Sequence, residues 1–231
     1  MKKLRLLIAC APVFCQASGQ TTETVKIAAG SDIAAAVSAY GIYRLPAFTK
    51  GTVFFKDGKM GKELLNYNIL NDQVLYISKT GDTLAVAAPE EIRKIELAAV
   101  PLYYDKKGWL EAVAVAGNTQ LLVKRKISIH YEKEGAFGIS NSTNGIDSYT
   151  MFTSNNNSYH LVVSEDAVIK RFSSWWLLQQ SGQVLPASRS GFMNAFANRQ
   201  KAIGSYLDNH KVNFNKEADL RDLLAIAVAD D

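Results

Sequence analysis

Cysteine is almost missing from this 231-residue chain. Its two cysteines, Cys10 and Cys15, both lie in an N-terminal segment that has the features of an export signal. If that segment is removed, the protein retains no thiol. Disulfide bonds, zinc–thiolate sites and cysteine nucleophiles are then excluded together. Residues 7–10 also resemble a lipoprotein box, so lipidation of Cys10 is an alternative fate of the same segment.

Long apolar runs are missing as well. The run over residues 6–14 is far shorter than the ~20 residues that a membrane-spanning helix needs. It follows three positive residues and precedes three small residues at positions 17–19. This order predicts a secretory signal peptide over residues 1–19, cleaved after Gly19 or, as a second choice, after Ala17. A buried N-terminal strand or helix is the alternative interpretation.

A marked excess of one charge is also lacking once the expected leader is removed. The whole chain has a formal net charge of +4. Removing the three positive residues of the leader reduces 26 Lys and Arg residues to 23, against 22 Asp and Glu residues, which is a net charge of about +1. The basicity therefore belongs mostly to the leader, and the composition does not favour nucleic acid as a partner.

The familiar catalytic motifs are absent. The chain has no G-x-S-x-G elbow, no phosphate-binding loop, no Rossmann glycine pattern and no Cys-x-x-Cys pair. A catalytic triad assembled from distant residues is still compatible with such a sequence. The sequence therefore favours a protein without a cofactor and leans away from an enzyme.

What the chain does have is a succession of short strand patterns over residues 51–97. The turn-forming pairs Asp57-Gly58, Asn71-Asp72 and Gly81-Asp82 divide this stretch into extended segments. Residues 65–69 alternate between apolar and amide side chains, which is the two-residue period of a half-buried strand. We therefore predict an antiparallel β-meander, arranged as a sandwich or as a partly closed barrel.

The clearest single strand pattern covers residues 120–132. Its odd positions from 121 to 131 are apolar, apart from Arg125, and its even positions are mostly polar. One face is therefore expected to meet the core and the other to meet water or a partner. Residues 168–179 are expected to form a further long strand.

After Pro186 the apolar period changes to that of helices, ending in a stripe at 220, 223, 224, 227 and 228. The chain is thus expected to contain a signal peptide (1–19), a lead-in with a short helix (20–50), an antiparallel β domain (51–184) and a helical segment packed on it (185–231). The predicted class is mainly β, or α+β.

The residues also resemble a known group of proteins. The order Gly51-Thr52-Val53, Asp57-Gly58 and Leu65-Asn66-Tyr67-Asn68, followed by a tail from Trp175-Trp176 to Asp219-Leu220, is similar to small secreted and envelope proteins of Bacteroidota. The resemblance covers most of the expected mature chain. It implies an extracytoplasmic location, in the periplasm, at the outer membrane or outside the cell. It implies no catalytic residues.

Three residues are candidates for a metal site. His130 and Glu132 lie two positions apart on one face of the expected strand, and His160 could approach from a neighbouring strand. Lys124 and Lys126 share that face, and their charge disfavours a cation. A solvated strand face is the favoured interpretation, so no metal ligand is assigned.

Aromatic and basic residues are candidates for ligand binding. Trp109 or Trp175 could stack on a sugar or lipid, although core packing is the default for such residues. Because neighbours on a strand face opposite ways, Trp175 and Trp176 cannot line the same surface. The basic stripe formed by Lys124, Lys126 and His130 could attract anionic glycans or lipid head groups.

Thr83 follows Asp82 and precedes Leu84, which is similar to the short O-glycosylation sequon of Bacteroidota. Modification at Thr83 is therefore an expectation of the sequence.

These observations favour a non-enzymatic, secreted or envelope-associated binding or structural module that recognises a protein, glycan or lipid. Two alternatives stay open. One is a hydrolase or metal-dependent enzyme that uses the histidine and glutamate cluster. The other is a lipocalin-like carrier, in which strands close around a small apolar ligand.

Overall fold

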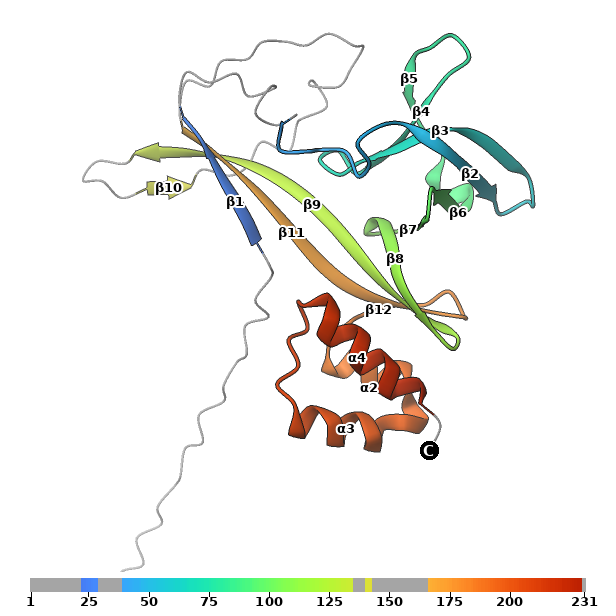
Figure 1. Cartoon of the computed structure of the whole chain (residues 1–231), viewed down its shortest axis with the longest axis vertical. Coiled ribbons are helices and arrows are strands. Elements are labelled where there is room, and N and C mark those ends of the chain that lie inside the picture. The colour runs from blue at the N-terminus through green and yellow to red at the C-terminus, as the bar shows by residue number, and fades with distance from the viewer. Residues whose placement is uncertain (1–21, 29–38, 135–139, 143–165, 230–231) are drawn as a thin grey trace, which may run out of the picture.

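The computed structural model describes residues 22–28, 39–134, 140–142 and 166–229. In this part of the chain, twelve strands form one antiparallel sheet with the main order β1-β11-β9-β8-β7-β6-β2-β3-β4-β5, while β10 pairs with β9 and β12 with β11 (Figure 1). The bounds are β1 Thr22–Ile27, β2 Thr49–Phe55, β3 Met60–Asn68, β4 Gln73–Ile77, β5 Thr83–Ala85, β6 Ile92–Leu97, β7 Val100–Asp105, β8 Gly108–Ala116, β9 Thr119–Glu134, β10 Ser140–Ser142, β11 Asp166–Gln179 and β12 Val184–Pro186. The predicted mainly β, antiparallel class is confirmed. The described sheet is open, because β1 and β5 lie at opposite ends of its order.

The meander turns lie where the sequence predicts them. Gly58 between β2 and β3 has a φ of 90°, and Gly81 between β4 and β5 has a φ of 89°. Asp72 in the turn between β3 and β4 also has a positive φ, of 54°. These are the left-handed conformations that Gly and Asp tolerate better than other residues. A single 3₁₀ turn, η1 Pro89–Glu91, then leads into β6.

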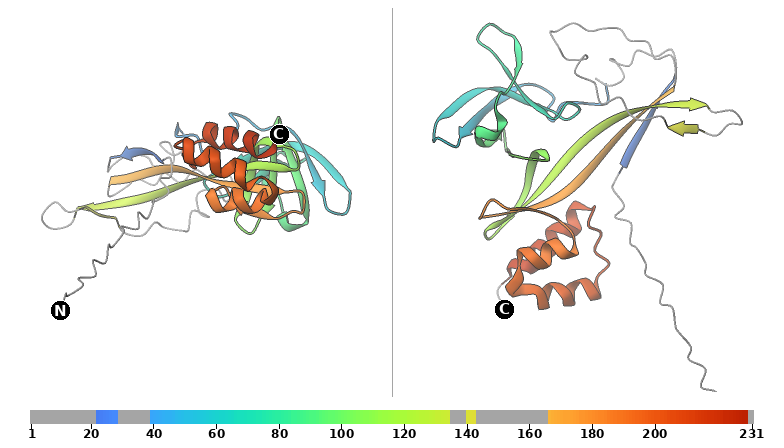
Figure 2. Two further views of the ribbon diagram at one scale, coloured as in Figure 1. Left: turned by 90° about the horizontal axis from the view of Figure 1, so that it is seen from below. Right: turned by 180° about the vertical axis from the view of Figure 1, so that it is seen from behind.

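The C-terminal helices gather at one end of the sheet. In the described residues they are α2 Arg189–Ala195, the 3₁₀ turn η3 Ala197–Arg199, α3 Gln200–Asn209 and α4 Glu217–Val228. Both views in Figure 2 place them together beside the ends of β8, β9 and β11. The predicted apolar stripe of α4 is confirmed, since Leu220, Leu223, Leu224 and Ala227 are buried. None of the described helices has both the length and the apolar character needed to cross a membrane.

Two hydrophobic cores share the long strands β9 and β11, which run side by side as a curved ribbon (Figure 1). The first core lies against the meander and includes Ile127 and Ile129 of β9. The second lies against the helices and includes Leu121 and Val123 of the same strand. All four side chains point to one face of β9, because they are separated by even numbers of residues. Arg125 stands between the two pairs, at the boundary of the two cores.

Two features of the fold correct the sequence analysis. The lead-in contains a strand that was not predicted, because β1 pairs along its whole length with β11. The face of β9 that carries the even-numbered residues is not entirely exposed to solvent. Leu122 on this face is fully buried between its cross-strand partners, Ala112 of β8 and Trp176 of β11. The predicted leader (1–19) and most of the predicted short helix of the lead-in lie outside the described residues.

Candidate functional site

A pocket forms where the helices meet the ends of the central strands. Its walls come from the β8–β9 turn, the end of β11 and the turn after it, the segment from α2 through η3, and the last turn of α4. The cavity measures about 640 Å³, which lies within the range of small-molecule sites. We call it the amide pocket, because half of its lining side chains are amides or hydroxyls: Asn118, Thr119, Gln179, Gln180, Ser181 and Asn198.

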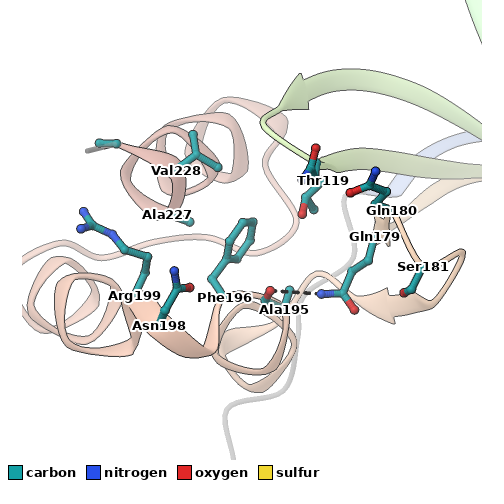
Figure 3. A pocket seen from close by; sticks show the side chains of 12 residues that line it. Thr119, Gln179, Gln180, Ser181, Ala195, Phe196, Asn198, Arg199, Ala227 and Val228 are labelled. Carbon is teal, nitrogen blue, oxygen red and sulfur yellow. Dashed lines mark hydrogen bonds between the residues drawn. The ribbon is translucent and has the colours of Figure 1, made fainter. Parts of the chain in front are cut away.

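Local interactions hold the strand side of this pocket in place. Gly182 has a φ of 83° and donates its N–H to the carbonyl of Gln179 at 2.9 Å, which closes the turn that carries Gln180 and Ser181. The side-chain amide of Gln179 donates to the carbonyl of Ala195 at 3.1 Å (Figure 3). Because this bond joins β11 to the end of α2, Gln179 positions the two walls relative to each other.

The helical side of the pocket is held by capping and aromatic packing. Ser188 caps α2, since its hydroxyl accepts the N–H of Gly191 at 3.2 Å. Phe192 is fully buried and stacks on Phe196, with ring centres 6.1 Å apart. Figure 3 shows the Phe196 ring between α4 and the strands, with Asn198 and Arg199 toward one end of the pocket. The helical wall of the pocket is therefore held in place by the Ser188 cap and by the stacked phenylalanine rings.

The chemistry of the lining is that of neutral hydrogen bonding. Amide groups both donate and accept, and hydroxyls do the same. Arg199 is the charged side chain in the lining, and Ala227 with Val228 adds an apolar patch. The last four carbonyls of an α-helix have no partner within the helix, so the end of α4 adds acceptors to the same wall. Such a surface suits an uncharged ligand with many hydroxyl groups.

A separate charged cluster joins the two cores. Glu111 of β8 is only 4% exposed. Its carboxylate accepts from Arg44 at 2.7 and 2.8 Å and from Arg125 at 3.0 and 3.3 Å. Burial by itself would raise the pKa of Glu111, but the hydrogen bonds and charges of the two guanidiniums outweigh it and lower that pKa. Every oxygen of Glu111 is thus engaged in holding the fold.

A second cluster surrounds Asp72. Its carboxylate accepts from the Tyr67 hydroxyl at 2.8 Å and from the backbone N–H of Trp109 at 3.2 Å, and it forms an ion pair with Lys124. Burial of Lys124 lowers the pKa of its ammonium group, although Asp72 opposes the shift. Burial is also the main reason that the pKa of Tyr67 is raised. The turn between β3 and β4 is thereby fastened to β8 and β9.

The structure places the predicted binding aromatics in the cores. Trp109 is 3% exposed in the first core, and Trp175 is 9% exposed in the second, where its indole N–H donates to the carbonyl of Asn215 at 3.1 Å. Neither ring is presented to a ligand, which corrects their candidacy. Trp176 faces the other side of the sheet, as alternation along a strand requires, with the Lys107 ammonium 4.6 Å from its ring centre.

The predicted basic stripe is also corrected. The side chain of Lys124 is only 13% exposed and forms an ion pair with Asp72, so its ammonium group is not available to bind an anionic ligand from solvent. Lys126 is exposed. The His130 side chain lies outside the described residues, although its backbone pairs with Val168. The stripe is therefore reduced from three positive groups to Lys126 and an undescribed histidine.

The side chains of the three candidate metal ligands lie outside the part of the chain that the structure describes. Those of His130 and Glu132 are not described, and neither is any part of His160. Among the residues whose side chains are described, no three His, Cys, Asp or Glu residues group closely enough to hold a metal ion. Thr83 lies on β5 and is exposed, so its hydroxyl is accessible in this structure.

Sequence reasoning missed the amide pocket, the buried Glu111 and the role of Asp72. A signal for Glu111 does exist, because it is the acid within the apolar stretch over residues 109–116, and Arg125 is the cation within the apolar face of β9. The amide pocket had no such signal, since its residues are common surface types spread over more than a hundred positions. The chain matches no protein-family model, no curated protein and no solved structure.

Proposed function

We propose that this protein is a non-enzymatic, extracytoplasmic binding module whose amide pocket receives an uncharged, polyhydroxylated ligand, that is, a glycan. The observation that carries the proposal is the composition of the pocket, in which six amide and hydroxyl side chains surround a cavity of about 640 Å³. Ligand sites orient their ligands by a few convergent polar groups on a well-formed cavity, and this pocket supplies such groups from the β8–β9 turn, the end of β11 with the turn after it, and η3.

The proposal also accounts for the small apolar part of the lining. The carbon face of a sugar ring is apolar, whereas its edge carries hydroxyls that donate and accept hydrogen bonds. Val228 offers an apolar contact at the end of α4, where its partly exposed side chain lies in the lining with the buried Phe196 and Ala227, and Asn198 and Gln180 are among the polar lining residues.

The two alternative functions have less support. A lipocalin-like carrier needs strands that close into a barrel, whereas the described sheet is open between β1 and β5. A metal-dependent hydrolase that uses His130, Glu132 and His160 is supported only by the spacing of these residues in the sequence. The binding module therefore remains the function that the geometry supports best.

A pair of matched double variants tests the glycan proposal. We expect Asn198→Ala combined with Ser181→Ala to weaken binding of the best oligosaccharide about ten- to thirty-fold, since each lost hydrogen bond is worth about 1 kcal/mol. Asn194→Ala combined with Ser205→Ala changes the same two residue types at exposed helical positions outside the pocket. This control should bind like the wild type.

The measurement is a screen of the purified protein against a broad set of neutral and carboxylated oligosaccharides, followed by calorimetric titration of the best one. Absence of any binder at millimolar concentration would contradict the proposal. Equal loss of affinity in the pocket and control variants would do the same, because it would assign the effect to general destabilisation.

The extracytoplasmic part of the proposal rests on the sequence of residues 1–19 and on the resemblance to secreted proteins of Bacteroidota. We expect intact-mass analysis of the protein from its native cell to show an N-terminus at Gln20, or at Ser18 if the second site is cut. Additional mass at Thr83 would reveal glycosylation, and a diacylglyceryl group would reveal lipidation of Cys10. An intact Met1 with both thiols retained would rule out the location proposed.

A further inference from the structure

A second cavity lies on the face of the sheet opposite the helices. It measures about 570 Å³ and crosses the strands in their order within the sheet, from β6 through β7, β8 and β9 to β11 and β12. We call it the tyrosine trough, because Tyr103 and Tyr104 of β7 both belong to its lining. Tyr103 pairs with Leu110 and shares its face of the sheet, whereas Tyr104 pairs with Trp109 and faces the other way. Its far end meets the tip of β11 and the β8–β9 turn, where Gln179, Gln180 and Asn118 line both cavities.

The floor of the trough is apolar. Leu178 and Val184 line it from β11 and β12 with partly exposed side chains, together with the fully buried Leu110 of β8, and four amide side chains complete the lining near the β8–β9 turn and the tip of β11. Val115, which belongs to the lining, is 70% exposed, more than any other large apolar side chain of the described structure. Together with the partly exposed Tyr103, Leu178 and Val184, it gives the trough an apolar surface that a ligand can reach. The floor therefore suits a hydrocarbon chain or another extended apolar group.

Two positive side chains stand together at the β6 end. Lys56 donates its backbone N–H to the carbonyl of Glu91 at 2.9 Å, which holds it beside the start of β6, and Arg93 lies 5.7 Å from the Phe54 ring centre. Both Lys56 and Arg93 are exposed and line the trough. Within the described part of the chain, neither forms an ion pair with a carboxylate.

The one carboxylate in the lining does not cancel this charge. Asp105 accepts from the backbone N–H of Lys107 at 3.1 Å and from its ammonium group at 2.9 Å. These interactions, acting against burial, lower the pKa of Asp105. Asp105 and Lys107 thus neutralise each other, and the charge that remains in the lining is the positive charge of Lys56 and Arg93.

We propose that the tyrosine trough binds an acyl chain that carries an anionic head group. The head group would lie at Lys56 and Arg93, and the chain would extend over Tyr103 and Leu178 toward Val184. The charge complementarity at one end and the apolar floor beyond it specify this amphiphile. Such a ligand has two sources, a free fatty acid or an anionic phospholipid. This site shares Asn118, Gln179 and Gln180 with the amide pocket, but its charged end and its acyl path are formed by other residues, so the proposal does not depend on glycan binding.

The test uses dodecanoate as the free acid, dodecanol as its uncharged analogue, and vesicles of phosphatidylglycerol as the lipid source. We expect Lys56→Gln combined with Arg93→Gln to weaken dodecanoate binding at least ten-fold in a fluorescent-probe displacement assay. Val115→Asp, at an exposed position on the rim, should weaken it as well by placing a like charge beside the chain. Lys62→Gln combined with Lys79→Gln removes the same net charge from exposed positions outside the trough and should leave affinity within two-fold of the wild type.

The probes that bind show whether the acyl ligand is a free fatty acid or a phospholipid. Binding of dodecanoate without binding to vesicles indicates a free acid, and binding to both with the same dependence on Lys56 and Arg93 indicates a phospholipid. Either result supports the site. Failure of both probes would overturn it, as would dodecanol binding as tightly as dodecanoate. An acidic peptide that binds more tightly than dodecanoate, with the same loss in the double variant, would overturn the acyl assignment.

Discussion

Replacing Glu111 by Gln should lower the free energy of unfolding by about 2–4 kcal/mol. Removing one partner of a buried ion pair typically costs about 3–5 kcal/mol, because the other charge is left buried without compensation. Here the side chains of Arg44 and Arg125 are 29% and 26% exposed, so water would recover part of that loss. For a chain of this size the expected fall in melting temperature is roughly 5–15 °C.

The same substitution should reduce the dependence of stability on pH. The pKa of Glu111 is lower in the folded protein than its ordinary value, so its contribution to stability is fully present above the unfolded-state pKa of about 4.3. That contribution is lost as the pH falls through the folded-state pKa. The unfolding free energies of wild type and Glu111→Gln, measured by urea titration between pH 7 and pH 2.5, should therefore converge toward acid pH.

Two control variants distinguish the loss of stability caused by removing the Glu111 charge from a loss caused by disturbed packing. Glu96→Gln removes the acid of the more exposed pair with Lys94 and should cost about 1 kcal/mol or less. Replacing all three members together (Arg44→Met, Glu111→Leu, Arg125→Met) should be far less damaging than Glu111→Gln alone, since it leaves no buried charge behind. A triple variant as unstable as the single one would contradict an electrostatic role for the cluster.

The fold class was predictable because each element carries its own local signal. Turn residues at 57–58, 71–72 and 81–82 adopt conformations that few residues tolerate, and these turns separate β2, β3, β4 and β5. The stripe of α4 was visible because its apolar residues recur with the helical period. The pairing of β1 with β11 had no such signal, since the two strands lie about 140 residues apart and β1 alternates only weakly.

The position of Glu111 could not be predicted because of one irregularity in the sheet. The β8–β9 hairpin begins with Ala116 opposite Thr119, and continued in that register it would place Glu111 opposite Lys124. A β-bulge between Ala112 and Ala114 shifts the register by one residue, so that Glu111 lies opposite Val123. A shift of one residue moves a side chain to the other face of the sheet. Glu111 thereby joins Arg125 on the core face.

The amide pocket escaped prediction for a different reason. Asn118, Gln179 and Asn198 are unremarkable in sequence, since exposed amides mark turns and helix ends throughout proteins. They become a site only when the helices pack against the ends of β9 and β11. That packing depends on interactions between segments distant in the chain, such as the bond from Gln179 to the Ala195 carbonyl. No local pattern contains this information.

Two glycine-to-alanine substitutions on neighbouring helices should have opposite effects on stability. At Gly191 in α2, an added Cβ would overlap the carbonyl oxygen of Pro186 and lie 3.0 Å from its carbonyl carbon. Since backbone cannot move aside as a flexible side chain can, α2 would shift away from β12. Overpacking of this kind typically costs about 1–3 kcal/mol, and disturbing the Ser188 cap would add about 1 kcal/mol. We expect a total loss of about 2–4 kcal/mol.

At Gly204 in α3, an added Cβ would lie 3.7 Å from Cε of Met193, which is an ordinary contact. Alanine in a helix interior is preferred over glycine by about 0.5–1 kcal/mol, so Gly204→Ala should stabilise the protein. Urea titration of both variants tests the pair, and glycan titration adds a readout of the pocket. Because α2 leads directly into Phe196 and Asn198, Gly191→Ala should weaken glycan binding, whereas Gly204→Ala should not. A stable Gly191→Ala protein with full affinity would mean that the close approach of α2 to β12 is not what builds the pocket.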